Sequence, residues 1–432
     1  MTASAVMEAT LACAEAQAGL GAVVRLMTSD EVQSPQHMPK SGPFHGVPML
    51  AKDLGSFAAG LAPAAGSATL RARVSDPPDD SDFFKGLRSL GLVPIGLSTT
   101  PEFGFALSSE PPNQPPALNP FDTTLSAGGS SGGAAAAVAA GIVAVAHATD
   151  AAGSLRVPAA CCGLWGLKPS RGATPMGPDF GNHLMGLVGE GILARSLRDI
   201  ATGFSVFRPY DQTPGQTTAH PRIALALPAR CDRDNATAAR HVADLFEAAG
   251  ADIVPVGAPD VLGLHAHKLV GLVLAISLAE WLDAFEIADA EISALAAANA
   301  ALGRATTGPQ VFALNRQIQQ ISHRAAALFE DVDAILMPIL SGPPPALGAF
   351  PTDHDDVGGH LAKMEALAPN AALANVAGLP ALAIPMPADG PMPTAVQLIG
   401  PQGADAMLLA LGAKISPPQV RYPNPIAGMP IS

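Results

Sequence analysis

Three short segments carry side chains that together could do nucleophilic chemistry. Lys52 ends the apolar stretch "GVPMLAKD", Ser130 lies in the glycine-rich segment "GGSSGG", and Ser154 lies in "DAAGSLRVP" after a second apolar stretch. A serine hydroxyl is a poor nucleophile until a base takes its proton, and a lysine whose desolvated ammonium has lost its proton can be that base. Brought together, the three side chains would form a Lys-Ser-Ser relay that needs no histidine.

The tiny residues before Ser154 fit the same chemistry. Side chains no larger than methyl leave backbone N–H groups free to point at an oxyanion that develops on a carbonyl. The candidate N–H groups are those of Ala151, Ala152, Gly153 and Ser154. Arg156 carries a fork of donors that can tie this loop down by hydrogen bonds, and Asp150 is a candidate partner for it.

Other interpretations of the glycine-rich segment compete with the relay. A phosphate-binding P-loop needs Lys and Ser or Thr directly after the last glycine, where Ala134 and Ala135 stand. The nucleophile elbow GxSxG of α/β-hydrolases fits residues 128–132 letter by letter, but it needs an apolar strand before the serine, and "NPFDTTLSA" indicates a loop. Each piece alone also has a structural explanation: a glycine-rich turn, an exposed Lys52 paired with the next residue, and Ser154 as a helix N-cap.

The expected secondary structure places these segments at the ends of strands. Apolar stretches predict buried strands over 46–54 and 142–150, and the alanine run closed by Gly141 predicts a short buried helix between them. Residues 1–40 are expected to be helical and then loop-like, and residues 262–330 largely helical. Alternating strands and helices indicate an α/β fold with a partly parallel sheet, in which ligands collect at the carboxyl ends of strands.

Composition limits the classes of function. The 432 residues are 48% hydrophobic and 14% charged, which is typical of a compact globular protein, and the net charge of −13 has no basic cluster that would favour nucleic acid. Four cysteines without metal-ligand spacing favour a reducing compartment. The longest apolar runs, such as 269–279, are too short to span a bilayer. We therefore expect a cytoplasmic protein, and we assign no role to His147, a lone histidine in an apolar strand.

The segments together resemble the amidase signature family. "GVPMLAKD" is similar to the family's G-V-P-x-x-x-K-D, "GGSSGG" matches its glycine loop without change, and "DAAGSLRVP" is similar to D-x-G-G-S-[IL]-R-x-P. The interval of 24 residues from Ser130 to Ser154 also agrees with the family. Weaker matches, among them "NPFD", "CGLWGLKPSRG" and "PTAVQLIG", extend the resemblance over nearly the whole chain.

The resemblance implies a fold and a set of roles. It implies one amidase domain over 1–432, an α/β fold with a mixed central sheet of about eleven strands surrounded by helices. The helical insertion at about 262–330 is expected to form part of the substrate pocket. Ser154 would be the acyl-forming nucleophile, Ser130 the bridging serine held by a cis peptide bond, and Lys52 the general base. The N–H groups of 151–154 would be the oxyanion donors, and Ser131, Asp150 and Arg156 would support the loops.

The implied reaction is hydrolysis of a carboxamide to a carboxylate and an amine or ammonia, without metal or organic cofactor. The expected partners are a small-molecule amide and a second copy of the chain in a homodimer, with no nucleic acid and no membrane. Two alternatives stay open: a glutamine-dependent amidotransferase subunit that passes ammonia to a partner, and a catalytically silent member of the family. The second rests on Ala152, where the family usually has glycine; a positive φ there would strain alanine by about 1–2 kcal/mol.

Overall fold

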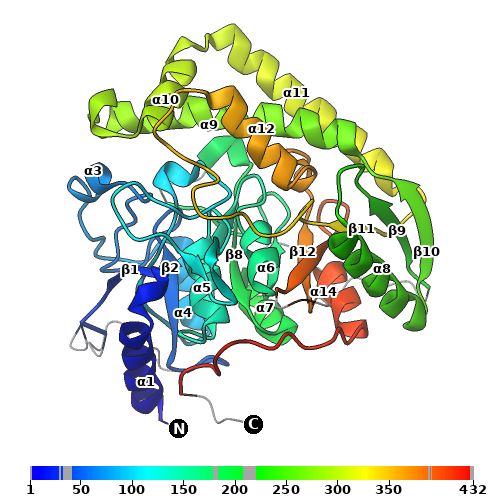
Figure 1. Ribbon diagram of the computed structural model, residues 1–432, viewed down its shortest axis with the longest axis horizontal. Coiled ribbons are helices and arrows are strands. Elements are labelled where there is room, and N and C mark those ends of the chain that lie inside the picture. The colour runs from blue at the N-terminus through cyan, green and yellow to red at the C-terminus, as the bar shows by residue number, and fades with distance from the viewer. Residues whose placement is uncertain are drawn as a thin grey trace.

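An 11-stranded mixed sheet runs through the centre of the molecule (Figure 1). The computed structural model describes residues 2–28, 31–32, 41–178, 183–207, 220–387, 390 and 392–428. In spatial order the strands are β1 (Val23–Leu26), β3 (Leu92–Ser98), β2 (Val47–Lys52), β6 (Val145–Asp150), β8 (Gly189–Ala194), β7 (Trp165–Lys168), β12 (Ala381–Met386), β13 (Thr394–Ile399), β11 (Ala334–Pro338), β9 (Arg222–Leu227) and β10 (Asp252–Gly257). The large mixed sheet that the family resemblance implies is confirmed.

Helices surround this sheet, and a group that includes the two longest lies across the top of Figure 1. That group contains α9 (Asp260–Ala284), α10 (Ala294–Ala305), α11 (Gly308–Ala326) and α12 (Val357–Leu367). The other helices are α1 (Ala3–Ala16), α3 (Ala68–Arg71), α4 (Asp82–Ser89), α5 (Gly132–Ala139), α6 (Arg156–Cys162), α7 (Leu197–Phe204), α8 (Arg233–Ala248), α13 (Ala371–Val376) and α14 (Asp405–Lys414). α8 packs on the strands β9, β10, β11 and β13.

The strands that carry the candidate residues are neighbours inside the sheet. β2 pairs in parallel with β6, and β6 pairs antiparallel with β8. Lys52 is the last residue of β2 and Asp150 the last residue of β6, so the carboxyl ends of two parallel strands bring both to one edge. The predicted strands over 46–54 and 142–150 are therefore confirmed.

The predicted buried helix is α5, which follows the glycine-rich segment. All eight of its residues are buried, and Gly141 just beyond its end has a φ of 79°. A Cβ at Gly133 would lie 2.2 Å from the backbone nitrogen of Thr99, so only glycine lets the start of the helix pack this close to β3. The packing holds the glycine-rich segment against the end of the sheet.

Two predictions for the first third of the chain need correction. The segment predicted as a loop before the glycines forms a small ribbon of β4 (Leu118–Asn119) and β5 (Asp122–Ser126). Three of the five residues of β5 are exposed, so it is not the buried strand that a hydrolase elbow needs. In the stretch expected to be helical and then loop-like, α1 is confirmed, but β1 also forms as an edge strand; residues 29–30 and 33–40 lie outside the described residues.

The helical stretch at 262–330 is confirmed as α9, α10 and α11. Within the described part of the chain, α9 is the one helix that is long and apolar enough to cross a membrane by length and composition, and half of its most apolar window is buried in the fold. The apolar run 269–279 lies inside this helix, which continues beyond the run to a length of 25 residues. Since α9 packs on α10, α11, α12 and α13, it has the contacts of a core helix.

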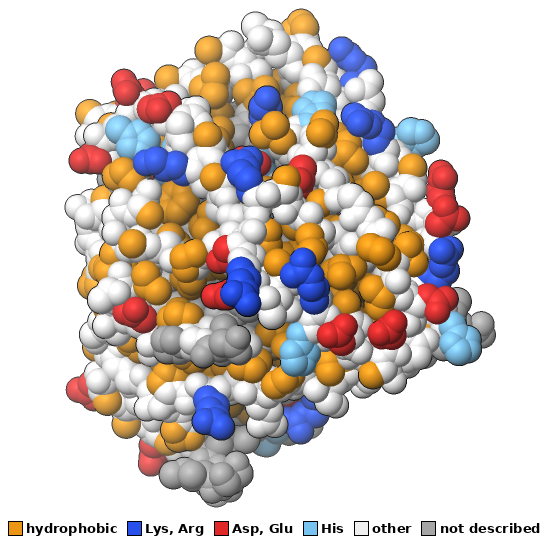
Figure 2. Space-filling model, turned by 45° about the vertical axis from the view of Figure 1, so that its right-hand side comes forward, with side chains coloured by type: hydrophobic (Ala, Val, Ile, Leu, Met, Phe, Trp, Pro, Cys, Tyr) orange, Lys and Arg blue, Asp and Glu red, His pale blue; other side chains and the backbone are white. Residues whose placement is uncertain are grey.

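The distribution of surface charge and the state of the cysteines agree with the expectations from composition. On the face shown in Figure 2, acidic and basic side chains are interspersed. The four cysteines are free thiols, and the adjacent Cys161 and Cys162 are both buried. Burial raises the pKa of Cys162 well above its usual value, so these two thiols stay protonated core side chains.

Candidate active site

Lys52 and Ser130 are in direct contact. Lys52 Nζ donates to Ser130 Oγ at 2.7 Å and to Thr149 Oγ1 at 2.8 Å. Lys52 is fully buried and Ser130 is 2% exposed, so no exposed ion pair with Asp53 exists. Asp53 is itself buried and is held by the N–H groups of Ala64 and Gly66. The contact brings the first two members of the predicted relay together.

Ser154 shares a small cavity with Ser130. Both residues, with Thr149 and Ala151, line this cavity of about 50 Å³, which we call the inner cavity. Ser154 does not cap α6, because that helix starts after Leu155 and has no side-chain cap. No described residue forms a hydrogen bond with Ser154 Oγ. The hydroxyl is therefore available to a molecule that enters the inner cavity.

The two serine loops are tied to each other and to β6. Ser131 N–H donates to the Ser154 carbonyl at 3.1 Å. The Ser131 hydroxyl lies 3.3 Å from both the carbonyl oxygen and the nitrogen of Thr149. The peptide bond between Gly129 and Ser130 is cis, as the family resemblance implies. A Cβ at Gly129 would lie 2.5 Å from the Ser108 carbonyl oxygen, which explains the glycine there.

Three of the four expected oxyanion donors have a free N–H group. The N–H groups of Ala151, Ala152 and Ser154 donate to no described residue, whereas Gly153 N–H donates to Asp150 Oδ1 at 2.7 Å. Gly153 is therefore removed from the expected set, because a donor already aimed at a carboxylate is not free for an oxyanion. Its φ of 108° still requires glycine.

Ala152 carries no backbone strain. It is absent from the described residues with positive φ, so alanine adopts the required conformation without penalty. Its side chain belongs to an apolar cluster with residues of α9 and α13 and does not line the inner cavity. The catalytically silent alternative rested on alanine in place of glycine at position 152. That difference has no structural consequence for the site.

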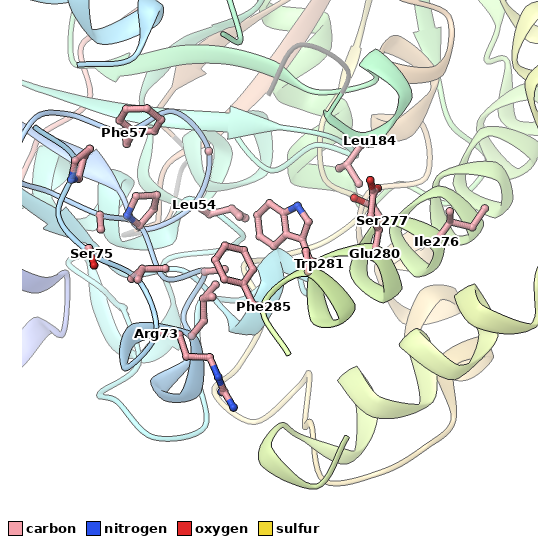
Figure 3. A pocket seen from close by; sticks show the side chains of 18 of the residues that line it. Leu54, Phe57, Arg73, Ser75, Leu184, Ile276, Ser277, Glu280, Trp281 and Phe285 are labelled. Atoms are coloured by element: carbon pink, nitrogen blue, oxygen red, sulfur yellow. The ribbon is translucent and has the colours of Figure 1, made fainter. Parts of the chain in front are cut away.

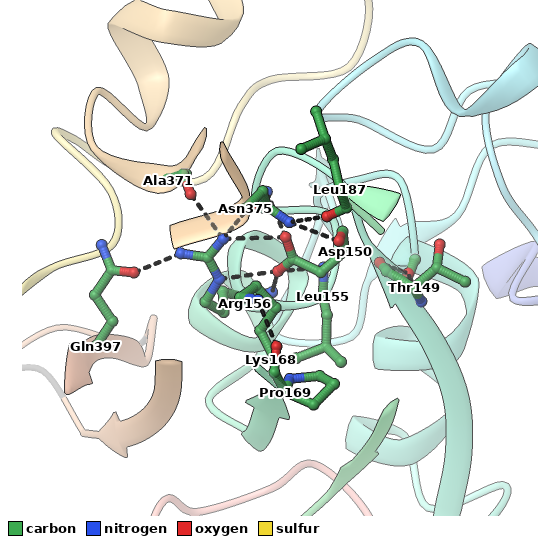
Figure 4. Close-up of polar contacts among 12 residues, drawn as sticks. Thr149, Asp150, Leu155, Arg156, Lys168, Pro169, Leu187, Ala371, Asn375 and Gln397 are labelled. Carbon is green, nitrogen blue, oxygen red and sulfur yellow. Dashed lines mark hydrogen bonds and ion pairs between the residues drawn. The ribbon is translucent and has the colours of Figure 1, made fainter. Parts of the chain in front are cut away.

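Asp150 and Arg156 form a fully buried bidentate ion pair (Figure 4). Arg156 Nε lies 2.9 Å from Asp150 Oδ2, and Nη2 lies 3.0 Å from Oδ1. Arg156 Nη1 donates to the Gln397 side chain at 2.6 Å, and Nη2 also donates to the Ala371 carbonyl at 2.7 Å. Burial alone would raise the pKa of Asp150, but Arg156 lowers it to about 2, so the carboxylate stays charged. The predicted partner of Arg156 is confirmed.

Arg156→Met is expected to destabilise the protein by roughly 3–5 kcal/mol, because it leaves the Asp150 carboxylate buried without its partner. Chemical denaturation followed by circular dichroism measures this loss. Arg304→Met is the control, since Arg304 pairs with Asp283 and Asp289 on the surface and should cost less than about 1 kcal/mol. Equal losses in the two variants would contradict the structural role of the buried pair.

His147 is a satisfied core side chain, as the sequence indicated. It is fully buried, and its Nδ1 accepts the backbone N–H of Lys52 at 3.1 Å. Since Nδ1 is an acceptor, the proton sits on Nε2, which pairs with Glu190 Oε2. The other Glu190 oxygen accepts the N–H of Ser56 at 3.1 Å. His147 therefore has no free nitrogen with which to act as a base toward Ser154.

The buried surroundings of Lys52 favour its neutral form. Burial lowers the pKa of Lys52 to about 7, although the negative charges of Glu190 and Asp150 oppose the shift. A large fraction of this amine is therefore unprotonated near neutral pH, which a general base requires. Thr149 and Glu190 were missed in the sequence. The glutamate inside the apolar strand "GEGILA" could have indicated a buried functional charge. Which side chains it lies near depends on the register between β6 and β8.

A larger cavity opens beside the inner one (Figure 3). It has a volume of about 720 Å³ and shares Leu54, Gly55, Leu184, Ser277 and Trp281 with the inner cavity. We call it the outer cavity. Ser277 and Trp281 belong to α9, so the helical stretch expected to contribute to a pocket does line both cavities. In the part of the chain that the structure describes, no group of three or more His, Cys, Asp or Glu side chains is placed to hold a metal ion.

Comparison with known proteins agrees with this architecture. The family model Amidase matches residues 5–409. A Synechocystis protein named as an amidase is 33% identical over 394 residues, which cover 85% of this chain and 74% of that protein. The 6-aminohexanoate-cyclic-dimer hydrolase of a Pseudomonas species is 30% identical over 433 residues, with 87% and 83% coverage.

Solved structures show the same fold. A structure of 6-aminohexanoate cyclic dimer hydrolase complexed with substrate superposes with a TM-score of 0.86 and 28% identity, and covers 96% of this chain and 93% of that one. A bacterial aryl acylamidase superposes with a TM-score of 0.82 at 23% identity. Fold and family model together define an amidase signature enzyme. The chain belongs to that family and is a hydrolase of amide C–N bonds, linear or cyclic.

Proposed function

We propose that this hydrolase cleaves its amide through an acyl-enzyme on Ser154, with neutral Lys52 acting as general base through Ser130. The observation that carries the proposal is the 2.7 Å contact between Lys52 Nζ and Ser130 Oγ, at the wall of a cavity to which Ser154 also contributes. A buried amine with a pKa of about 7 is an effective proton acceptor at neutral pH.

Acylation moves two protons and exchanges one bond for another. Lys52 Nζ takes the proton of Ser130 while Ser130 Oγ takes the proton of Ser154, whose oxygen bonds to the amide carbon. The carbonyl π electrons move to oxygen, and the free N–H groups of 151, 152 and 154 stabilise that charge. When the C–N bond breaks, the proton held by Lys52 returns through Ser130 to the leaving nitrogen.

Deacylation repeats the same steps with water as the nucleophile. Water bonds to the acyl carbon and gives its proton through Ser130 to Lys52. The bond between the acyl carbon and Ser154 Oγ then breaks, and Ser154 recovers its proton through the same relay. The products are a carboxylic acid, which ionises in water, and the regenerated enzyme.

The relay needs one movement of a side chain. The described structure has the hydrogen bond between Lys52 and Ser130 but none between Ser130 and Ser154. A serine hydroxyl reorients by rotation about its Cα–Cβ bond, and hydrogen bonds of catalytic groups often tighten only when substrate is bound. Because both hydroxyls line the inner cavity, rotation of Ser154 is the step that we propose completes the relay.

Glu190→Gln is expected to shift the acidic limb of the kcat/KM profile to lower pH. Glu190 raises the pKa of Lys52, so loss of its charge lets the ammonium lose its proton more readily. The pH dependence of kcat/KM for an uncharged amide measures the shift. Glu190→Asp keeps the charge and should keep the limb closer to that of the unchanged protein. A limb that does not move in Glu190→Gln would contradict an electrostatic effect of Glu190 on the base.

The general test of the proposed function is a panel of aryl, aliphatic and cyclic amides with mass-spectrometric detection of the acyl-enzyme. The cyclic amides belong in the panel because relatives named as cyclic-dimer hydrolases share this fold. An acyl mass on the Ser154 peptide supports the proposal, and an adduct elsewhere refutes it. Release of ammonia from glutamine only in the presence of a partner protein would favour the amidotransferase alternative.

Two further expectations accompany the proposed function. We propose a reducing cytoplasmic location, which is supported by four unpaired cysteines. We also keep the homodimer as an expectation, which light scattering coupled to size-exclusion chromatography measures as the mass of one or two chains.

A further inference from the structure

The outer cavity has the size and lining of a substrate pocket. Aromatic and aliphatic side chains make up most of its wall, including Phe57, Leu70, Val74, Trp281 and Phe285. Its volume of about 720 Å³ lies in the range of small-molecule sites. Because it shares five lining residues with the inner cavity, the part of an amide substrate that lies away from the reacting bond would occupy it.

The charges that line the outer cavity are unequal. Among the described residues that line the outer cavity, Arg73 is the one with a cationic side chain. Its Nη2 already donates to both carboxylate oxygens of Glu291, at 2.8 and 3.0 Å. Glu280 also lines the cavity, and no described residue forms a hydrogen bond or ion pair with its carboxylate. The formal charge that remains without a partner in the wall is therefore negative.

The position of Glu280 on its helix adds to the negative charge of the outer cavity. Glu280 lies on α9, which ends at Ala284, and both Ala284 and the following Phe285 line the cavity. The carboxyl end of a helix carries a partial negative charge. It therefore attracts a cation, as the Glu280 carboxylate does. In Figure 3, Trp281 lies in the middle of the view, between Leu54 and Glu280, and Phe285 lies below Trp281. Faces of aromatic rings attract cations as well.

We propose that the outer cavity binds a protonated amino group of the substrate, and that Glu280 determines this specificity. The inference rests on the proposed function. The ligand class is an amide whose distal part is an apolar chain that ends in an ammonium group. Glu280 is one helical turn, about 5 Å along the axis, from Ser277, which lines both cavities. A chain of several methylene groups is long enough to join an amide in the inner cavity to Glu280.

The preference should be set by charge rather than by length. An amide with an uncharged alkyl chain still buries its apolar surface in the cavity, whereas a chain that ends in carboxylate meets a like charge. We therefore expect the order ammonium, methyl, carboxylate in kcat/KM for chains of equal length. Added salt should weaken the ammonium preference, since Glu280 is solvent-exposed.

The test uses three 4-nitroanilides of equal chain length: 6-aminohexanoyl, heptanoyl and the half-amide of heptanedioic acid. A second series carries the same end groups on the amine half, and the series with the charge preference identifies which half the outer cavity holds. We expect kcat/KM for the ammonium compound to exceed that for the methyl compound at least fivefold. In Glu280→Gln that ratio should fall to about one, and in Glu280→Lys the carboxylate compound should become the best of the three.

The control is Glu247→Gln, which removes an exposed carboxylate on α8, a helix that contributes no residue to the lining of the outer cavity. The ammonium-to-methyl ratio should stay as in the unchanged protein. An unaltered ratio in Glu280→Gln, or no preference in either series, would overturn the inference. Hydrolysis of the methyl compound that disappears with Ser154→Ala shows, independently, that the proposed function itself holds.

Discussion

Ser154→Ala is expected to form no acyl-enzyme and to lose amide hydrolysis by a factor on the order of 10⁴ or more. The variant keeps the N–H groups of the loop and the Lys52–Ser130 contact but lacks the oxygen that bonds to the amide carbon. Fluorophosphonate labelling followed by mass spectrometry of the intact protein and of its peptides measures the adduct. The variant should fold normally, because only a hydroxyl without a described hydrogen-bond partner is removed.

Ser277→Ala is the matched control for the nucleophile. Ser277 also presents a side chain to the inner cavity, but it is on α9 and has no described contact with Lys52 or Ser130. The adduct on Ser154 should still form in this variant. Labelling that persists in Ser154→Ala, or that disappears in Ser277→Ala while Ser154 remains, would refute the assignment of the nucleophile.

Lys52→Met is expected to slow acylation by a factor on the order of 10³, the usual contribution of a general base. Methionine has a similar length and no charge to desolvate, so the fold should be retained. The rate of fluorophosphonate labelling measures the effect without requiring turnover. A rate within a few-fold of that of the unchanged protein would mean that Ser130 is activated by some other group.

The chain offers a close control for this lysine. Lys168 is also buried, and burial lowers its pKa to about 7 as well, but its Nζ donates to the Pro169 carbonyl. Lys168→Met therefore removes an equally perturbed amine without touching the serines. Its labelling rate should keep the pH dependence of the unchanged protein. The comparison separates the chemical role of Lys52 from the general effect of emptying a buried lysine site.

The predictable part of the site was local in sequence. Lys52, Ser130 and Ser154 each lie in a short motif whose neighbours limit what the residue can do, and the chain order of strand, loop and helix brings the motifs to one edge of the sheet. The pairing of Asp150 with Arg156 was predictable for the same reason, since only the five residues of the loop between β6 and α6 separate them.

The unpredicted part depends on pairing between distant segments. The effect of Glu190 on Lys52 requires Thr149 to lie opposite Glu190 in the ladder of β6 and β8, and no local pattern specifies that register. The N–H of Gly153 was wrongly counted as free because its hydrogen bond to Asp150 depends on the turn that the loop takes. The outer cavity likewise depends on how α9 packs against residues 54–77, which composition alone does not fix.

The pH dependence of fluorophosphonate labelling at Ser154 tests the central claim most directly. If a buried amine accepts the serine proton through Ser130, the labelling rate should rise with pH as Lys52 loses its proton, with a midpoint near its pKa of about 7. That titration should be absent in Lys52→Met and retained in Lys168→Met. A midpoint that stays in place after Lys52 is replaced would contradict the account.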